Sequence, residues 1–105
     1  MSDLWRGIKA FKEGQYQEAH VFLEPAAISG SCEACLLLSR MYFAGNGVEQ
    51  SRDRYAFWLC RAAELGDPAA RAKIKRMLRS NTLPTAVKED VFVSRLSGVA
   101  ARQSS

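Results

Sequence analysis

Residues 45–66 read GNGVEQSRDRYAFWLCRAAELG, and this stretch decides the fold. Glycine and asparagine tolerate the positive φ of tight turns, so the opening Gly-Asn-Gly indicates a turn. The residues that follow carry apolar side chains at helical spacing, which predicts a helix from about Arg52 to Leu65 that ends at Gly66. We expect this helix to bury Tyr55, Trp58, Leu59 and Ala62.

Five further segments show the same helical periodicity between turn or capping residues. They predict helices over residues 3–13, 16–29, 32–43, 68–79 and 85–96. Asp3, Ser31 and Asp67 stand where a side chain can accept a hydrogen bond from the first turn of a helix, so we expect them to be N-caps. Pro25 lies inside the second of these helices, where proline removes a hydrogen bond and can kink or shorten the helix. No stretch alternates with a period of two residues, so the sequence predicts an all-α fold.

The chain repeats its landmarks after 36 residues. With this shift, Phe22 falls on Trp58 and Gly30 falls on Gly66. The other superimposed pairs are Leu23 with Leu59, Ala26–Ala27 with Ala62–Ala63, Ser31 with Asp67, Ala34 with Ala70, Leu38 with Ile74, and Met41 with Met77. A helix–turn–helix unit that recurs with such a period predicts stacked helix pairs, each of which buries its apolar face on its neighbour.

The second repeat carries the residues of a known motif in order and spacing: Gly45-x-Gly47-Val48, Trp58, Ala62-Ala63-Glu64-x-Gly66 and Ala70. The chain therefore resembles the Sel1-like branch of the tetratricopeptide-repeat family over roughly residues 4–79, and its first repeat is similar to an ordinary tetratricopeptide unit. The resemblance implies a short right-handed superhelix of antiparallel helix pairs and a protein of bacterial type. Together with the helix pattern, it leads us to expect one domain over residues 1–97, with repeats at about 3–30 and 31–66, a partial repeat at 67–80, and a capping helix at about 85–97. From their composition, residues 98–105 are expected to be a flexible tail.

The family resemblance also implies a function, because such repeats generally hold a peptide or another protein on a curved surface and have no catalytic centre. We therefore expect a non-catalytic protein–protein interaction module, an adaptor or regulatory binding protein, without a cofactor or a metal. In repeats of this type the first helix of each pair lines the concave face. Seven residues on these helices fall off the predicted core stripe and are the candidate partner-binding residues: Arg6, Lys9, Ser39, Arg40, Phe43, Lys75 and Arg79.

Charge is distributed unevenly along the chain. The formal net charge is +4, but residues 1–50 carry more acidic than basic side chains, whereas residues 51–105 are strongly basic. A basic run without an acid lies on the helix predicted at 68–79: Arg71, Lys73, Lys75, Arg76 and Arg79. This run fits a solvated helix face, an acidic protein or peptide partner, or, as the alternative function, a small basic nucleic-acid-associated protein. An anionic membrane surface is the weakest option, because the apolar residues of this helix are needed for the core.

The three cysteines and the single histidine do not form a recognisable catalytic or metal-binding motif. Cys32-x-x-Cys35 lacks the second ligand pair of a structural zinc site, and no strand precedes it as in thioredoxin-like motifs. Some bacterial Sel1-like proteins carry disulfides between paired helices; Cys35 lies near one such position, but Ala27 occupies the place of its partner. We expect Cys32, Cys35 and Cys60 to be thiols in or near the core, and His20 to be a satisfied or surface residue.

The compartment is predicted from what the sequence lacks. No basic and apolar leader opens the chain, and no apolar run approaches the roughly 20 residues that span a bilayer. An odd number of cysteines is typical of a reducing compartment. We therefore expect a cytoplasmic protein without membrane insertion. Because a chain of 105 residues has a modest core, self-association into a homo-oligomer is also expected to be accessible.

Overall fold

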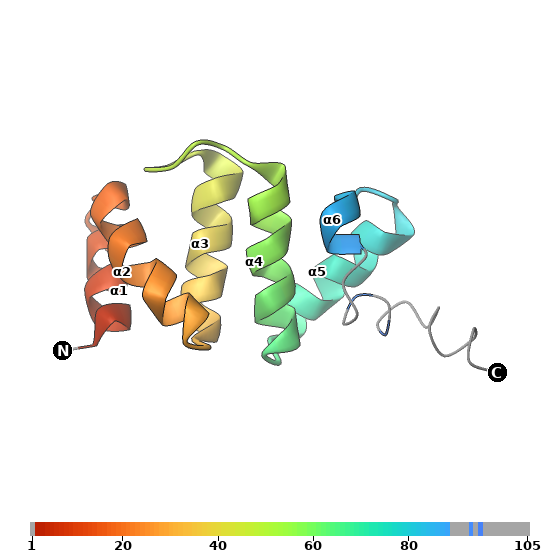
Figure 1. The fold of residues 1–105 in the computed structure, drawn as a ribbon, viewed down its shortest axis with the longest axis horizontal. Helices are drawn as coiled ribbons and strands as arrows, with labels where there is room; N and C mark the ends of the chain where they lie inside the picture. Colours follow the sequence, from red (N-terminus) through yellow and green to blue (C-terminus); the bar gives the residue numbers. More distant parts are fainter. Residues whose placement is uncertain (1, 89–92, 94, 96–105) are drawn as a thin grey trace.

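The computed structural model describes residues 2–88, 93 and 95. The helices are α1 (Asp3–Lys12), α2 (Tyr16–Ile28), α3 (Cys32–Ala44), α4 (Arg52–Glu64), α5 (Pro68–Arg79) and α6 (Thr85–Lys88). The described residues contain no strand, which confirms the predicted all-α fold. Figure 1 shows the helices following one another from α1 at one end of the molecule to α5 and α6 at the other. Over the same residues, no helix combines the length and the hydrophobicity that a membrane span requires.

The observed helix ends lie within one or two residues of the predicted ones for α1 to α5. For the helix predicted at 85–96, the structure describes Thr85–Lys88 and places Val93 and Arg95 in helix as well. The other residues of that predicted helix, and the tail predicted at 98–105, lie outside the described residues. Helix α2 continues through Pro25 to Ile28, so proline does not shorten it.

Side-chain caps fix the starts of four helices. Ser31 and Asp67 cap α3 and α5 as predicted, and the Asp67 carboxylate accepts a hydrogen bond of 2.8 Å from the Ala70 amide. The prediction for Asp3 is wrong, because the cap of α1 is Ser2, whose hydroxyl accepts from the Trp5 amide at 3.2 Å. Asp3 instead lies in the first turn, where a carboxylate interacts favourably with the helix dipole. In α4 the cap is Ser51.

The corner between α2 and α3 and the corner between α4 and α5 are closed by the same hydrogen bonds, 36 residues apart. The donor and acceptor pairs of the first corner are Ser29–Pro25, Gly30–Ala27 and Ser31–Ala26, and those of the second are Leu65–Arg61, Gly66–Ala63 and Asp67–Ala62. Gly30 and Gly66 have φ values of +105° and +109°, which glycine adopts at little cost. The two corners are therefore equivalent in sequence and in backbone structure.

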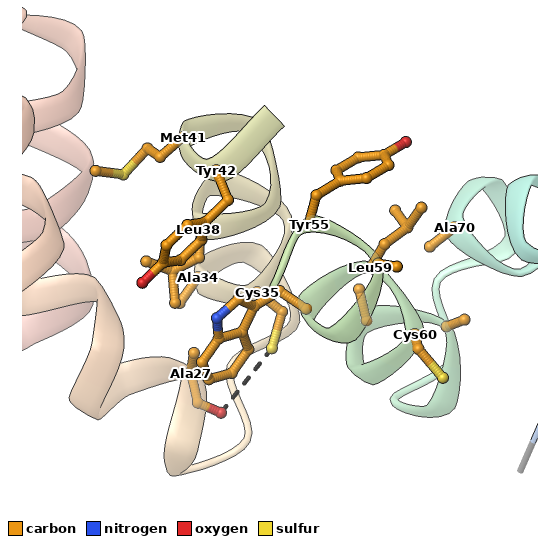
Figure 2. Packing of buried hydrophobic residues seen from close by; sticks show 14 of the residues in the cluster. Ala27, Ala34, Cys35, Leu38, Met41, Tyr42, Tyr55, Leu59, Cys60 and Ala70 are labelled. Carbon is orange, nitrogen blue, oxygen red and sulfur yellow. Dashed lines mark hydrogen bonds between the residues drawn. The ribbon is translucent and has the colours of Figure 1, made fainter. Parts of the chain in front are cut away.

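Packing follows the order of the chain. Helix α1 packs mainly on α2 and α3 mainly on α4, while α2 contacts α3, α4 contacts α5, and α6 contacts α4. Small residues allow these close approaches: a Cβ atom on Gly7 of α1 would lie 2.6 Å from Cδ2 of the buried Leu23 of α2. Figure 2 shows the centre of the core, where Leu38 of α3 and Leu59 of α4 belong to one cluster of buried residues.

The turn between α3 and α4 also packs on the first helix pair. Gly47 has a φ of +72°, and a Cβ atom there would lie 2.6 Å from the carbonyl carbon of Tyr16 and 2.8 Å from the Gln17 amide nitrogen. Within the turn, the Gln50 side chain donates to the Phe43 carbonyl at 2.9 Å. The Gly-Asn-Gly sequence thus serves two purposes, since it reverses the chain and lets its backbone approach the start of α2.

Candidate partner-binding surface

Helix α5 exposes a continuous basic surface. Its residues Ala70, Ile74 and Met77 are buried, Leu78 is half-buried against the core, and its other side chains are exposed. The five cations of the predicted basic run are all exposed: Arg71, Lys73, Lys75, Arg76 and Arg79. Helix α5 contains no acidic residue. The ion pairs among the described residues are His20–Glu24 and Arg61–Glu64, so Lys75, Arg76 and Arg79 pair with none of the described carboxylates.

An aromatic and basic cluster connects α3, α4 and α5. The Phe43 side chain is 62% exposed, and its ring centroid lies 5.0 Å from that of the buried Tyr55. From α5, the Lys73 ammonium lies 5.9 Å from the centroid of the same Tyr55 ring, within the range of a cation–π interaction. Arg40, one turn before Phe43 on α3, is exposed. Of the seven predicted partner-binding residues, Arg40, Phe43, Lys75 and Arg79 are thus exposed on α3 and α5.

Arg6 and Lys9 belong to a separate hollow on α1 and α2. The hollow has a volume of about 300 Å³. The Arg6 guanidinium carbon lies 5.8 Å from the centroid of the Phe22 ring, and the Lys9 ammonium lies 5.4 Å from that of Trp5. Glu13 and Glu18 also line it, so its two cations are accompanied by two carboxylates. Its charge therefore differs from that of α5.

The prediction that Ser39 lies off the core, on which its choice as a partner-binding residue was based, is wrong. Ser39 is 3% exposed, and its hydroxyl donates a hydrogen bond of 2.7 Å to the Leu36 carbonyl. The cause is that α3 packs on both α2 and α4, so its buried arc is wider than the single stripe that the periodicity indicates. Ser39 lies within this arc, and its local hydrogen bond satisfies the hydroxyl.

Two further hollows involve residues that the sequence did not single out as a site. In the first, of about 660 Å³, the Nε2 atom of His20 lies 3.0 Å from the Tyr42 hydroxyl and 3.3 Å from a carboxylate oxygen of Glu24. His20 is thus a satisfied residue, one of the two expected alternatives. The second hollow, of about 490 Å³, lies between α4 and α6 and is lined in part by Phe57 and Val87. His20 and Tyr42 are separated by 22 positions in the sequence, which explains why no local pattern indicates the first hollow.

All three cysteines lie in the described part of the chain, and none is in a disulfide. Cys35 and Cys60 are buried and Cys32 is half-buried, which confirms the prediction of thiols in or near the core. The Cys32 thiol donates to the Ala62 carbonyl at 3.6 Å, and the Cys35 thiol donates to the Ala27 carbonyl at 3.9 Å (Figure 2). Among the described residues, no group of three His, Cys, Asp or Glu side chains could hold a metal ion.

The buried thiol of Cys35 predicts a loss of stability at alkaline pH. Burial raises the pKa of Cys35 from 9.0 to about 11. Above pH 9.0 the unfolded thiol ionises while the folded thiol stays protonated, so the unfolded state binds fewer protons and the free energy of unfolding falls. We expect this fall, measured by urea denaturation at about pH 8 and about pH 10, to be smaller for Cys35→Ala than for the original chain. An equal fall in the free energy of unfolding for the two chains would contradict the prediction.

No protein-family model, no curated protein and no solved structure matches this chain.

Proposed function

We propose that this protein is a non-catalytic binding module, an adaptor or regulatory protein that holds an acidic protein or peptide. The observation that carries the proposal is the exposed surface of α5, with five cations and no acidic residue. Phe43 is exposed and contacts the Tyr55 ring, which the Lys73 ammonium also approaches. Phe43 therefore adds an apolar contact near Lys73, one of these five cations. The candidate partner-binding residues that are exposed on α3 and α5 are Arg40, Phe43, Lys75 and Arg79.

The proposed architecture behind this function is a short right-handed solenoid of the Sel1-like or tetratricopeptide-like type. The helix pairs would be α1 with α2 and α3 with α4, followed by α5 as a partial repeat and α6 as a cap. Two observations support the proposal: the equivalent corners 36 residues apart, and packing that joins mainly helices adjacent in the chain. In such an arrangement each helix pair completes the core of its neighbour.

The proposed mechanism combines several weak contacts on a preformed surface. A single exposed ion pair contributes only about 0–1 kcal/mol, so no one cation of α5 would hold a partner alone. Several cations close together raise the rate of encounter with an acidic chain and fix its orientation. Covering the exposed Phe43 ring adds about 1–2 kcal/mol of apolar burial. The favoured partner is therefore an acidic segment that also carries a bulky apolar side chain.

Charge reversal tests the proposal. The variant Arg40→Glu, Lys75→Glu, Arg79→Glu is expected to reduce partner capture from the native cell extract by at least about tenfold, because it replaces attraction by repulsion. Its helical circular dichroism should be unchanged, since all three side chains are exposed. The matched control, Lys12→Glu, Arg52→Glu, Lys88→Glu, has the same net charge but changes exposed cations outside the candidate partner-binding residues. An equal loss of capture in both variants would show that net charge, and not this surface, is responsible.

Nucleic acid is the second candidate partner, and it is favoured by the same run of cations on α5. Phosphates and carboxylates both attract this surface, but binding to duplex nucleic acid falls steeply as salt rises because counterions are released. Capture is therefore repeated with nuclease at low and high salt. A protein that survives both treatments supports the adaptor function. Recovery of nucleic acid alone, lost at high salt, would replace it by the nucleic-acid function.

A further inference from the structure

Helix α2 has an exposed face that is both acidic and apolar. Each of its members lies three or four positions from another, which places their side chains on one side of the helix. We call this set the α2 face: Glu18, Val21, Glu24, Pro25 and Ile28. Four of them are exposed, and the Glu24 side chain is 45% exposed. Helix α2 contains no Lys or Arg beside its two carboxylates.

A second surface combines an apolar side chain with cations. The Phe43 ring of α3 contacts the Tyr55 ring, whose centroid lies 5.9 Å from the Lys73 ammonium of α5. Arg76 follows Lys73 by three positions and is therefore its neighbour on the surface of α5. Both cations are exposed, and neither pairs with a described carboxylate. We call Phe43, Lys73 and Arg76 the Phe43 surface.

The most exposed large apolar side chains of the described residues lie on these two surfaces. Ile28 and Val21 are 66% and 64% exposed, and Phe43 is 62% exposed. Single exposed apolar side chains are common, but apolar side chains with charged groups at their rim are typical of interaction sites. The charges of the two surfaces have opposite sign, and opposite charges steer surfaces together and fix their orientation. The α2 face therefore has the composition expected of the partner, carboxylates beside bulky apolar side chains.

Figure 1 shows α2 near one end of the row of helices and α5 near the other, so the two surfaces of one chain lie apart. We propose that the protein self-associates: the α2 face of one copy binds the Phe43 surface of another. The carboxylates of the α2 face pair with Lys73 and Arg76, and its apolar residues cover the Phe43 ring. Because different faces of the two copies meet, the contact is heterologous. This inference rests on the proposed function and names a second copy as the occupant of the same basic region.

Sedimentation velocity of the chain at several concentrations and two salt levels tests the inference. The average mass should exceed that of one chain and rise with concentration. The dissociation constant should be at least about tenfold higher at about 0.5 M salt than at about 0.05 M, because salt screens exposed charges. The mass of a single chain under all conditions would overturn self-association. That result would leave the proposed function in place, which fails separately if the variant Arg40→Glu, Lys75→Glu, Arg79→Glu still captures its partner from the extract.

Two charge-reversed variants locate the contact. Lys73→Glu with Arg76→Glu changes the Phe43 surface, and Glu18→Lys with Glu24→Lys changes the α2 face. Each variant alone should self-associate with a dissociation constant at least about tenfold higher, because like charges then face each other. A mixture of the two should associate again, since the first retains the original α2 face and the second retains the original Phe43 surface. Recovery in the mixture also shows that both variants fold, whereas a mixture that stays monomeric would overturn this contact.

Two controls separate the contact from net charge and from general hydrophobicity. Lys12→Glu with Lys88→Glu lowers the net charge as much as the change on α5, but these exposed cations lie outside both surfaces, so self-association should be unchanged. Ile28→Ser should raise the dissociation constant at high salt by at least about threefold, because less apolar surface is covered. Leu65→Ser removes an apolar side chain that is 42% exposed elsewhere and should have no such effect. Equal weakening by Ile28→Ser and Leu65→Ser would contradict the role of the α2 face.

Discussion

Replacement of Gly47 by alanine is expected to lower the free energy of unfolding by about 3 kcal/mol, since two costs add. The positive φ of +72° disfavours any residue with a Cβ atom, and that atom would lie 2.6 Å from the backbone of Tyr16. Backbone atoms cannot move aside as the end of a long side chain can, so the turn and α2 must separate. For a domain of this size the melting temperature should fall by about 10–20 °C.

Gly14 provides the matched control for this experiment. Its φ of +76° imposes the same backbone strain, but a Cβ atom there would meet nothing within 4 Å. We expect Gly14→Ala to cost about 1 kcal/mol, so the difference between the two variants measures the contact of the turn with α2. Thermal or urea denaturation gives both values. Equal losses for Gly14→Ala and Gly47→Ala would contradict the contact with Tyr16.

Replacement of Trp58 by alanine is expected to cost about 4 kcal/mol, because it removes a large side chain from the core and leaves a cavity. Trp58 is only 7% exposed. Its counterpart in the first repeat, Phe22, is half-buried and touches the Arg6 guanidinium, so Phe22→Ala should cost about half as much, about 2 kcal/mol. Urea denaturation of the two variants measures both losses, and unchanged m-values would show that the differences reflect stability alone. A larger loss of stability for Phe22→Ala than for Trp58→Ala would show that the α1–α2 pair contributes more to the stability of the core than α4 does.

Local signals account for most of the fold that could be predicted. Ser31 and Asp67 start α3 and α5, and glycines with positive φ follow the ends of α1, α2 and α4 at Gly14, Gly30 and Gly66. Capping and left-handed conformations depend on the residue itself, so the sequence predicts them. The cap of α1 was assigned one residue late, since Ser2 and Asp3 are both good caps and only the backbone shows which is extended. The sequence also could not show whether Pro25 shortens α2, because contacts with the neighbouring helices decide whether a helix continues past a proline.

The candidate site could be predicted only in part. The basic run on α5 is exposed as its spacing indicates, because Arg71, Lys75, Arg76 and Arg79 lie away from the buried residues of the helix and Lys73 lies at their edge, near the Tyr55 ring. Ser39 was misplaced because a sequence does not show how many neighbours a helix has. The contacts of Phe43 with Tyr55 and of His20 with Tyr42 join residues on different helices, so helical periodicity alone could not reveal them.

Packing between helices that are adjacent in the chain has a kinetic consequence. Each of α1 to α5 contacts the helix before or after it, so most native contacts close only short loops. Short loops lose little entropy on closing, and helical proteins with such local contacts fold within about microseconds to milliseconds. The α1–α2 hairpin can therefore form while later residues are still being synthesised, and it then offers the start of α2 as a template for the turn at Gly47.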